Sequence, residues 1–236
     1  MIEPAEIQDL SRGLYTKAKA VWCRFEPERP ECFIQAGFDL PDPLQKAVAK
    51  RQTEFLAGRY CVKQLYQQSR LDLDLPVYRD HKSPLWPDGY IGSISHTRGI
   101  AAAVLGSKQD YLGLGLDLEP VIHPKTAERV QSMILRPEER QLLETSVDYL
   151  RDLTIVFSFK ESLYKSLNPT LNRFIGFHEV QVISLHNGIV DWLPLGELKQ
   201  DLVGLEGFRG RFLLQDQLVL TSFEWLNEAF VCSVLK

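Results

Sequence analysis

The sequence has few cysteines and no apolar run long enough to cross a bilayer, and each shortage excludes a class of protein. The four cysteines lie far apart and form no CxxC pair: Cys23, Cys32, Cys61 and Cys232. This spacing indicates reduced thiols in a cytosolic protein rather than zinc ligands or a disulfide framework. No apolar run approaches the roughly 20 residues of a transmembrane helix, and the N-terminus MIEPAEIQDLSRGLY carries acids and no apolar signal segment. We therefore expect a soluble, cytoplasmic protein that does not bind membranes.

A surplus of positive charge is also lacking. The chain has 27 Lys and Arg against 31 Asp and Glu, a formal charge of −4 and a pI near 5.8. Non-specific nucleic-acid binding needs an excess of basic residues, so we expect no nucleic-acid partner. With 236 residues, 44% of them apolar, the chain can bury a core as one large domain or two small ones.

Helical and strand patterns alternate in blocks along the chain, which predicts an α+β fold. Helices are expected over 43–68, over 128–144 with a break at Pro137, and over 153–167, where Asn-Pro ends the last one. Strands are expected over 90–95, 100–105, 112–118, 180–183, 189–193, 218–223 and 230–234. The first three strands are predicted to form one antiparallel meander.

The stretch YLGLGLDLEP, residues 111–120, places leucine at every second position, which is the period of a strand. Its other face reads Gly113, Gly115, Asp117 and Glu119. The two acids have backbones about 7 Å apart, so both carboxylates can converge on one hard cation. The glycines leave that face open to a neighbouring element or a ligand. A half-exposed strand that shows polar residues to water is the alternative interpretation.

In a meander, the turn SISHT and the acids of DLE lie at the same edge of the sheet, although about 20 residues separate them. The reason is that the second strand begins at this turn, and the third runs antiparallel to it. The sequence therefore predicts that His96 and Asp117 lie close together.

The segment LTIVFSFKESLYKSLN has a helical period with a polar stripe and an apolar face. The stripe contains Thr154, Ser158, Glu161 and Lys165, and the apolar face contains Ile155, Val156, Phe159, Leu163 and Leu167. Glu161 and Lys165 are one turn apart, so a surface ion pair is one interpretation. Lys160 falls among apolar residues and needs an anion or a path to solvent.

Basic residues occur where an anionic ligand can use them. Arg51 and Arg59 are eight residues apart on the first predicted helix, about 12 Å along its axis. Lys82 lies in the loop before SPLWPDG. Solvated surface charges explain each one singly. Together with three carboxylates, they suit a Mg²⁺-bridged pyrophosphate with further phosphate nearby.

Three motifs in this order resemble the signatures of 4'-phosphopantetheinyl transferases of the Sfp/EntD type: WPDGYIGSISHT, GLGLDLEP and FSFKESLYKSL. The preceding KRQTEFLAGRYC resembles the helix that this family places before its SISH turn. The resemblance covers residues 46–183, and its most specific part is the DxE strand followed by the KESxxK helix. The residues before and after this range add little to it.

The resemblance implies two similar α+β halves related by a pseudo-twofold axis, with coenzyme A between them. The halves would comprise residues 1–116 and 117–236, and such a chain is expected to work as a monomer. The chemistry implied is attack by a carrier-protein serine on the β-phosphate of coenzyme A. Phosphopantetheine moves to the serine, and adenosine 3',5'-bisphosphate leaves.

The resemblance also implies a role for each matching residue. Asp117, Glu119 and Glu161 would bind Mg²⁺, and Lys165 would contact the pyrophosphate. The residues expected to contact coenzyme A, by its phosphates or 3'-phosphate region, are Arg51, Arg59, Lys82, Ser95 and His96. Glu161 is the candidate base for the serine hydroxyl, directly or through a metal-bound water. Glu138 is expected to have a structural role at a helix start.

Two other functions remain compatible with parts of the pattern. A non-catalytic module that binds coenzyme A or a carrier protein would keep the basic residues and His96 but would not need three acids. A Mg²⁺-dependent phosphohydrolase would use a DxE strand and a distant glutamate but would not need the SISH turn. The carrier is also open, because siderophore, polyketide and fatty-acid synthesis all use carrier proteins with the same target serine.

Overall fold

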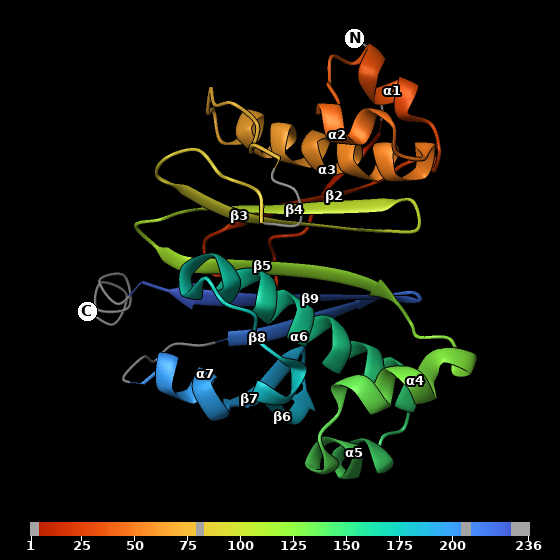
Figure 1. Cartoon of the computed structure of the whole chain (residues 1–236), viewed down its shortest axis with the longest axis vertical. Coiled ribbons are helices and arrows are strands. Elements are labelled where there is room, and N and C mark those ends of the chain that lie inside the picture. The colour runs from red at the N-terminus through yellow and green to blue at the C-terminus, as the bar shows by residue number, and fades with distance from the viewer. Residues whose placement is uncertain (1–4, 79–82, 204–208, 228–236) are drawn as a thin grey trace. The chain divides into compact units, whose positions relative to one another are not determined.

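The computed structural model describes residues 5–78, 83–203 and 209–227, and the chain divides into two compact units, Met1–Lys108 and Gln109–Lys236. Each unit combines an antiparallel sheet with helices (Figure 1), which confirms the α+β fold class. The sequence analysis placed the boundary at 116/117, inside strand β5 (Tyr111–Pro120). Because β5 pairs with a strand of the second unit along nearly its whole length, the structure divides the chain ahead of β5.

The first unit is a four-stranded sheet covered on one face by helix α3 (Figure 1). The sheet order is β1-β2-β4-β3, and the strands are β1 (Ile7–Asp9), β2 (Lys19–Arg24), β3 (Tyr90–Thr97) and β4 (Ile100–Ser107). The helices are α1 (Pro30–Gln35), α2 (Asp42–Gln45) and α3 (Ala49–Gln68). Leu56, Tyr60 and Leu65 of α3 are buried in one core with Cys23, Ala101 and Ala103 of the sheet.

Two predicted details of this unit differ from the structure. The helix expected over 43–68 is two helices, because the chain is extended at Val48, the N-cap residue of α3. His96 was expected in a four-residue turn but lies within β3, and the turn consists of Arg98 and Gly99 alone. Both turn residues have positive φ, 33° and 79°, which is the backbone of a tight two-residue hairpin.

The second unit is a five-stranded sheet with α6 lying along β5 and β9 (Figure 1). The order is β5-β9-β8-β7-β6, with β6 (Val180–His186), β7 (Ile189–Pro194), β8 (Arg209–Gln215) and β9 (Leu218–Leu226) joining β5. The helices are α4 (Pro124–Ile134), α5 (Pro137–Glu144), α6 (Tyr149–Leu171), the 3₁₀ turn η1 (Phe177–Glu179) and α7 (Gly196–Asp201). The apolar face predicted for α6 is confirmed, since its five residues are buried.

The predicted three-strand meander is wrong. β3 and β4 pair as expected, but β5 belongs to the other sheet and pairs with β9, about 100 residues later in the chain. A short connection between strands favours a hairpin, but here the open glycine face of β5 packs on α6 of the second unit. The meander therefore gives no basis for a shared edge between His96 and Asp117.

The predictions for the second unit are only partly confirmed: α7 and β8 were not expected, and α6 begins at Tyr149 instead of Leu153. The break at Pro137 is confirmed, and the β6–β7 hairpin turns at Asn187 and Gly188, both with positive φ. However, α6 does not end at Asn168-Pro169; it continues to Leu171, and Asn172 in the left-handed conformation caps it. The strand predicted over 230–234 lies outside the described residues. Within the described ranges, no helix has the length and hydropathy that a bilayer-spanning segment requires.

The two glycines of β5 allow α6 to lie directly on the strand. A Cβ added at Gly115 would be 1.8 Å from the carbonyl oxygen of Ser162, and one at Gly113 would be 2.5 Å from that of Ser166. Both contacts are with helix backbone, which cannot rotate away. The glycines therefore set the distance between β5 and α6, the two elements that carry the acids.

Replacing Gly115 by alanine is expected to push α6 away from β5 and to lower the free energy of unfolding by about 1–3 kcal/mol, the usual cost of overpacking. Thermal unfolding measures this loss. Gly176→Ala is the matched control, because a Cβ there would have its nearest neighbour, Glu179 Oε1, at 3.8 Å. Equal melting temperatures for the two variants would show that the close β5–α6 approach does not limit stability.

Candidate active site

Asp117 is a buried acid of the second unit with several hydrogen-bond partners. It is 3% exposed, and Lys165 Nζ lies 2.6 Å from its Oδ1. Ser158 donates to its Oδ2 at 2.8 Å and lies 2.9 Å from the hydroxyl of Thr221, which is opposite Asp117 on β9. The polar stripe of α6 therefore faces the sheet rather than solvent, and Lys165 pairs with Asp117 instead of forming a surface pair within its own helix.

Glu161 is half-buried beside this cluster. Burial raises the pKa of its carboxyl, and the negative charge of Asp117 raises it further, while Lys165 opposes the shift. Within the described parts of the chain, Glu161 makes no hydrogen bond or ion pair. A carboxylate in this situation gains stability from any cation that reaches it or from taking up a proton.

Glu119 lies two residues after Asp117 on β5 and is half-buried. Strand geometry places it on the same face as Asp117. Among the described residues, no three His, Cys, Asp or Glu side chains are close enough together to form a metal-binding group. The structure thus brings Asp117 into electrostatic range of Glu161, while the approach of Glu119 to this pair stays a prediction.

Lys160, the neighbour of Glu161, finds the anion that its sequence position requires. Its Nζ lies 2.7 Å from Glu139 Oε2 and donates to the carbonyl of Ile134, and both charged side chains are almost fully buried. Glu139 also accepts hydrogen bonds from the backbone N–H groups of Arg136 and Val182. This buried ion pair, Lys160–Glu139, ties α6 to α5 and β6 at the residue that precedes Glu161. Glu138, exposed at the start of α5, forms an ion pair with Arg136.

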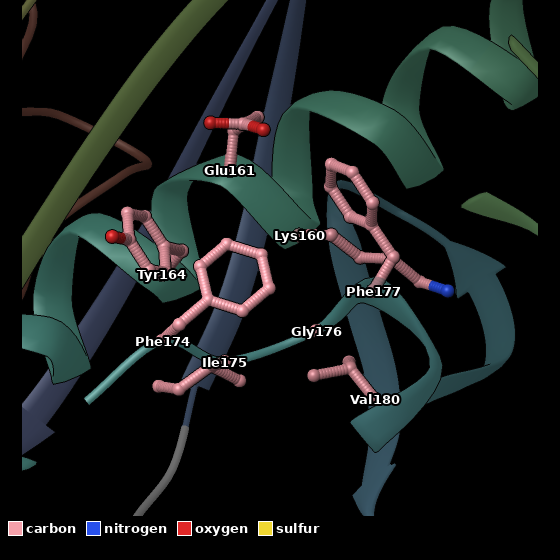
Figure 2. A pocket seen from close by; sticks show the side chains of 8 residues that line it. All are labelled: Lys160, Glu161, Tyr164, Phe174, Ile175, Gly176, Phe177 and Val180. Carbon is pink, nitrogen blue, oxygen red and sulfur yellow. The ribbon is translucent and has the colours of Figure 1, made fainter. Parts of the chain in front are cut away.

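An apolar pocket adjoins Glu161. Lys160, Glu161 and Tyr164 of α6 line one side, and Phe174, Ile175, Gly176, Phe177 and Val180 line the other. Figure 2 shows the rings of Tyr164, Phe174 and Phe177 gathered beside Glu161, and the Tyr164 and Phe174 ring centroids are 5.8 Å apart. Phe174 is 75% exposed, so the pocket offers aromatic surface to a ligand chain next to an acid.

Two arginines of α3 provide positive charge in the first unit. Arg59 is 6% exposed, stacks on the ring of Phe55 at 4.4 Å and makes no ion pair with an acid among the described residues. Burial lowers the pKa of Arg59 to about 10, and the nearby charge of Arg51 adds to the shift. A buried charge without a counter-ion is unstable. An anion that binds beside this guanidinium would therefore stabilise it.

His96 is contacted by two residues of α3. Arg51 Nη1 is 3.0 Å from its Nε2, and Glu54 Oε2 is 3.6 Å from its Nδ1. Ser95, the preceding strand residue, is buried and points to the opposite face of the sheet, because side chains alternate along a strand. The structure therefore joins Arg51 with His96, and a role of Ser95 in this site stays a prediction. Lys82 lies outside the described residues.

Two family models match the chain. The 4'-phosphopantetheinyl transferase N-terminal domain matches residues 40–106, and the 4'-phosphopantetheinyl transferase superfamily matches residues 113–202. The transferase PptT of Mycobacterium tuberculosis is 30% identical over 187 residues, which cover 76% of this chain and 81% of that protein. The chain belongs to the 4'-phosphopantetheinyl transferase superfamily.

Other relatives agree with this assignment. The 4'-phosphopantetheinyl transferase Npt of Nocardia iowensis is 29% identical, over 77% of this transferase and 86% of Npt. Enterobactin synthase component D of Salmonella typhimurium is 35% identical, over 61% of this transferase and 59% of that protein. The structure of Thermotoga maritima holo-[acyl-carrier-protein] synthase aligns over 49% of this chain and 63% of that one, with 20% identity and a TM-score of 0.36. A score this low carries no argument about function.

Three features of the transferase were not found from its sequence. Glu139 follows Glu138 in LRPEER, and the unexplained Lys160 was the one available signal that a buried acid must exist. Glu54 lies one turn after Arg51, where an i,i+3 pair on a helix predicts only a surface contact. The aromatic pocket combines α6 with residues 174–180, and no short-range pattern links those two segments.

Proposed function

We propose that this transferase moves 4'-phosphopantetheine from coenzyme A to a serine of an apo-carrier protein, requires Mg²⁺ and releases adenosine 3',5'-bisphosphate. The observation that carries the proposal is the cluster of Asp117, Glu161 and Lys165, formed by β5 and α6 within a chain of this family. Acids for a divalent cation and a lysine for a phosphate are the groups that phosphoryl transfer needs.

Basic residues of the first unit bind the phosphates of coenzyme A in this proposal. Arg59 has a buried guanidinium without an acidic partner among the described residues, and Arg51 lies near it. Arginine presents N–H groups that match phosphate oxygens in geometry and charge. His96 is in contact with Arg51 and belongs to the same site. Lys82 and Ser95 contact coenzyme A in this proposal, as the family resemblance implies.

The acids of the second unit fit a magnesium ion. Glu161 has a raised pKa and forms no ion pair with the described residues, and Asp117 holds an ammonium group at one of its oxygens. Asp117, Glu119 and Glu161 would hold the ion. When bound, Mg²⁺ would supply positive charge to the pyrophosphate oxygens during transfer.

In the reaction, Glu161 takes up a proton and Lys165 stabilises negative charge. A serine hydroxyl attacks phosphorus effectively only as its proton is removed. Glu161 accepts this proton, directly or through water, in this proposal. Lys165 stabilises the negative charge on the departing bisphosphate. The bond from phosphorus to the bridging oxygen breaks as the bond to the serine oxygen forms.

The pocket beside Glu161 suits the pantetheine chain. That chain is attached to the phosphorus that the serine attacks, so it lies near the base during transfer. Tyr164 and Phe174 offer it apolar surface. Carrier-protein residues next to the serine would then lie over the exposed ring of Phe174.

Incubation with coenzyme A, Mg²⁺ and a panel of apo-carrier proteins tests the proposal. We expect a carrier to gain the mass of one phosphopantetheine, with one equivalent of adenosine 3',5'-bisphosphate released, and we expect EDTA to stop the reaction. Acyl, peptidyl and aryl carriers assayed side by side identify the preferred class. Carriers that all stay unmodified while coenzyme A binds would show a binding module, and hydrolysis without transfer would show a phosphohydrolase.

Replacing Glu161 by glutamine is expected to abolish most transfer and yet to stabilise the metal-free protein at pH 7.5. The folded protein holds this carboxyl at a raised pKa, so the stability of the wild type falls as the pH rises through that pKa. Glutamine carries no charge, so the variant avoids the free-energy cost of ionising a half-buried carboxyl. The gain in stability should vanish below the ordinary pKa of glutamate, where the wild type is protonated. Melting temperatures in EDTA at pH 4 and pH 7.5 measure the difference, and a gain independent of pH would contradict it.

A further inference from the structure

Two side chains of opposite charge on α3 hold the ring of His96. Arg51 Nη1 is 3.0 Å from Nε2, and Glu54 Oε2 is 3.6 Å from Nδ1. Arginine N–H groups only donate, so Nε2 must accept this hydrogen bond and the ring hydrogen lies on Nδ1. His96 is thus a neutral ring here, with its N–H on the side of the Glu54 carboxylate.

Glu54 is well placed to influence the charge of this ring. Its side chain is only 13% exposed, so solvent and salt screen its charge less than that of a surface glutamate. The charged residues that line a pocket together with Glu54 are Lys50 of α3, Arg98 of the β3–β4 turn and Glu28. The Glu54 carboxylate lies within ion-pair distance of His96 Nδ1, so it can stabilise the ring once the ring is protonated.

We propose that Glu54 is the positioning residue of the 3'-phosphate subsite, and that His96 takes up a proton against it when coenzyme A binds. The inference rests on the proposed function. The nitrogen Nε2 can donate to a phosphate oxygen only after it gains a hydrogen, and solvent supplies that proton. Arg51 then turns its N–H groups from the ring to the phosphate. Glu54 accepts from Nδ1–H, fixes the orientation of the ring and stabilises its positive charge.

This arrangement makes the 3'-phosphate a condition for proton uptake. A ligand without that phosphate offers Nε2 no new acceptor, so the ring keeps its hydrogen bond with Arg51. The transferase therefore distinguishes coenzyme A from 3'-dephospho-coenzyme A through a change of charge on His96. Glu54 contributes to this discrimination without touching either ligand.

Isothermal titration calorimetry with the full chain at pH 7.5, in two buffers of different ionisation enthalpy, counts the protons taken up on binding. At this pH the phosphate, with a second pKa near 6, is already a dianion. We expect proton uptake with coenzyme A and none with 3'-dephospho-coenzyme A. Glu54→Gln is expected to remove the uptake and to weaken coenzyme A binding about tenfold, the equivalent of one pKa unit, while binding of the dephospho form stays unchanged.

Glu28→Gln is the matched control, because Glu28 lines the same pocket, and it should keep both the uptake and the affinity. Proton uptake that persists in Glu54→Gln, or that is absent in the wild type despite tight binding of coenzyme A, would overturn the role of Glu54. If the wild type binds neither ligand, the proposed function fails and the inference fails with it. A merely structural role for Glu54 would lower both affinities equally and is excluded by the unchanged dephospho form.

Discussion

Replacing Asp117 by asparagine is expected to reduce phosphopantetheine transfer by at least about 10³-fold. In the proposed site this carboxylate binds Mg²⁺ and holds Lys165 at 2.6 Å, so one substitution weakens both the metal and the orientation of the lysine. Loss of several kcal/mol of charge stabilisation in the transition state corresponds to this factor. Single-turnover transfer to an apo-carrier at saturating Mg²⁺ measures it.

Asparagine is preferable to alanine at this position. Alanine would remove the carboxylate that accepts hydrogen bonds from the buried Ser158 hydroxyl and from the Lys165 ammonium. Asparagine keeps the size and one acceptor oxygen, so the variant should fold. Near-normal turnover of Asp117→Asn would remove this residue from the metal site.

Replacing Lys160 by methionine is expected to lower the free energy of unfolding by about 3–5 kcal/mol. The side chains of Lys160 and Glu139 are 1% and 0% exposed, and removal of one partner leaves the other charge buried without compensation. Burial already lowers the pKa of Lys160, and the charge of Glu139 opposes that shift. For a chain of this size, the loss corresponds to a melting temperature lower by on the order of 10 °C.

The double variant Lys160→Met, Glu139→Leu is the control for this prediction. Without either charge, the core between α5 and α6 loses no ion-pair partner, so much of the stability should return. The Glu139 hydrogen bonds to the Arg136 and Val182 N–H groups are still lost, and recovery should therefore be incomplete. A double variant less stable than Lys160→Met alone would show that these backbone contacts, rather than the ion pair, hold α5 in place.

The parts of the site that the sequence predicted are those encoded within one element. The face of Gly113, Gly115 and Asp117 follows from the strand period, and it does meet α6 closely. The apolar face of α6 follows from the helical period in the same way. The need of Lys160 for an anion was also visible, because a lysine among apolar residues has few alternatives.

The parts that the sequence did not predict depend on which elements pair across long distances. The connection between β4 and β5 is short, which favours a hairpin, yet β5 pairs with β9. Nothing local in LRPEER distinguishes the exposed Glu138 from the buried Glu139, because only the tertiary position of α5 separates them. The pairing of Glu54 with His96 depends on how α3 lies across its sheet, which no spacing within the helix records.

The order of the second sheet has a consequence for biosynthesis. Asp117 lies on a strand whose partner, β9 (Leu218–Leu226), comes much later in the chain, and Thr221 of β9 completes the hydrogen-bonded group around Ser158. A nascent polypeptide still on the ribosome therefore lacks the scaffold that positions this acid until β9 has been translated. Premature termination between α6 and β9 would leave a product that carries every acid of the proposed site but lacks the strand that pairs with β5.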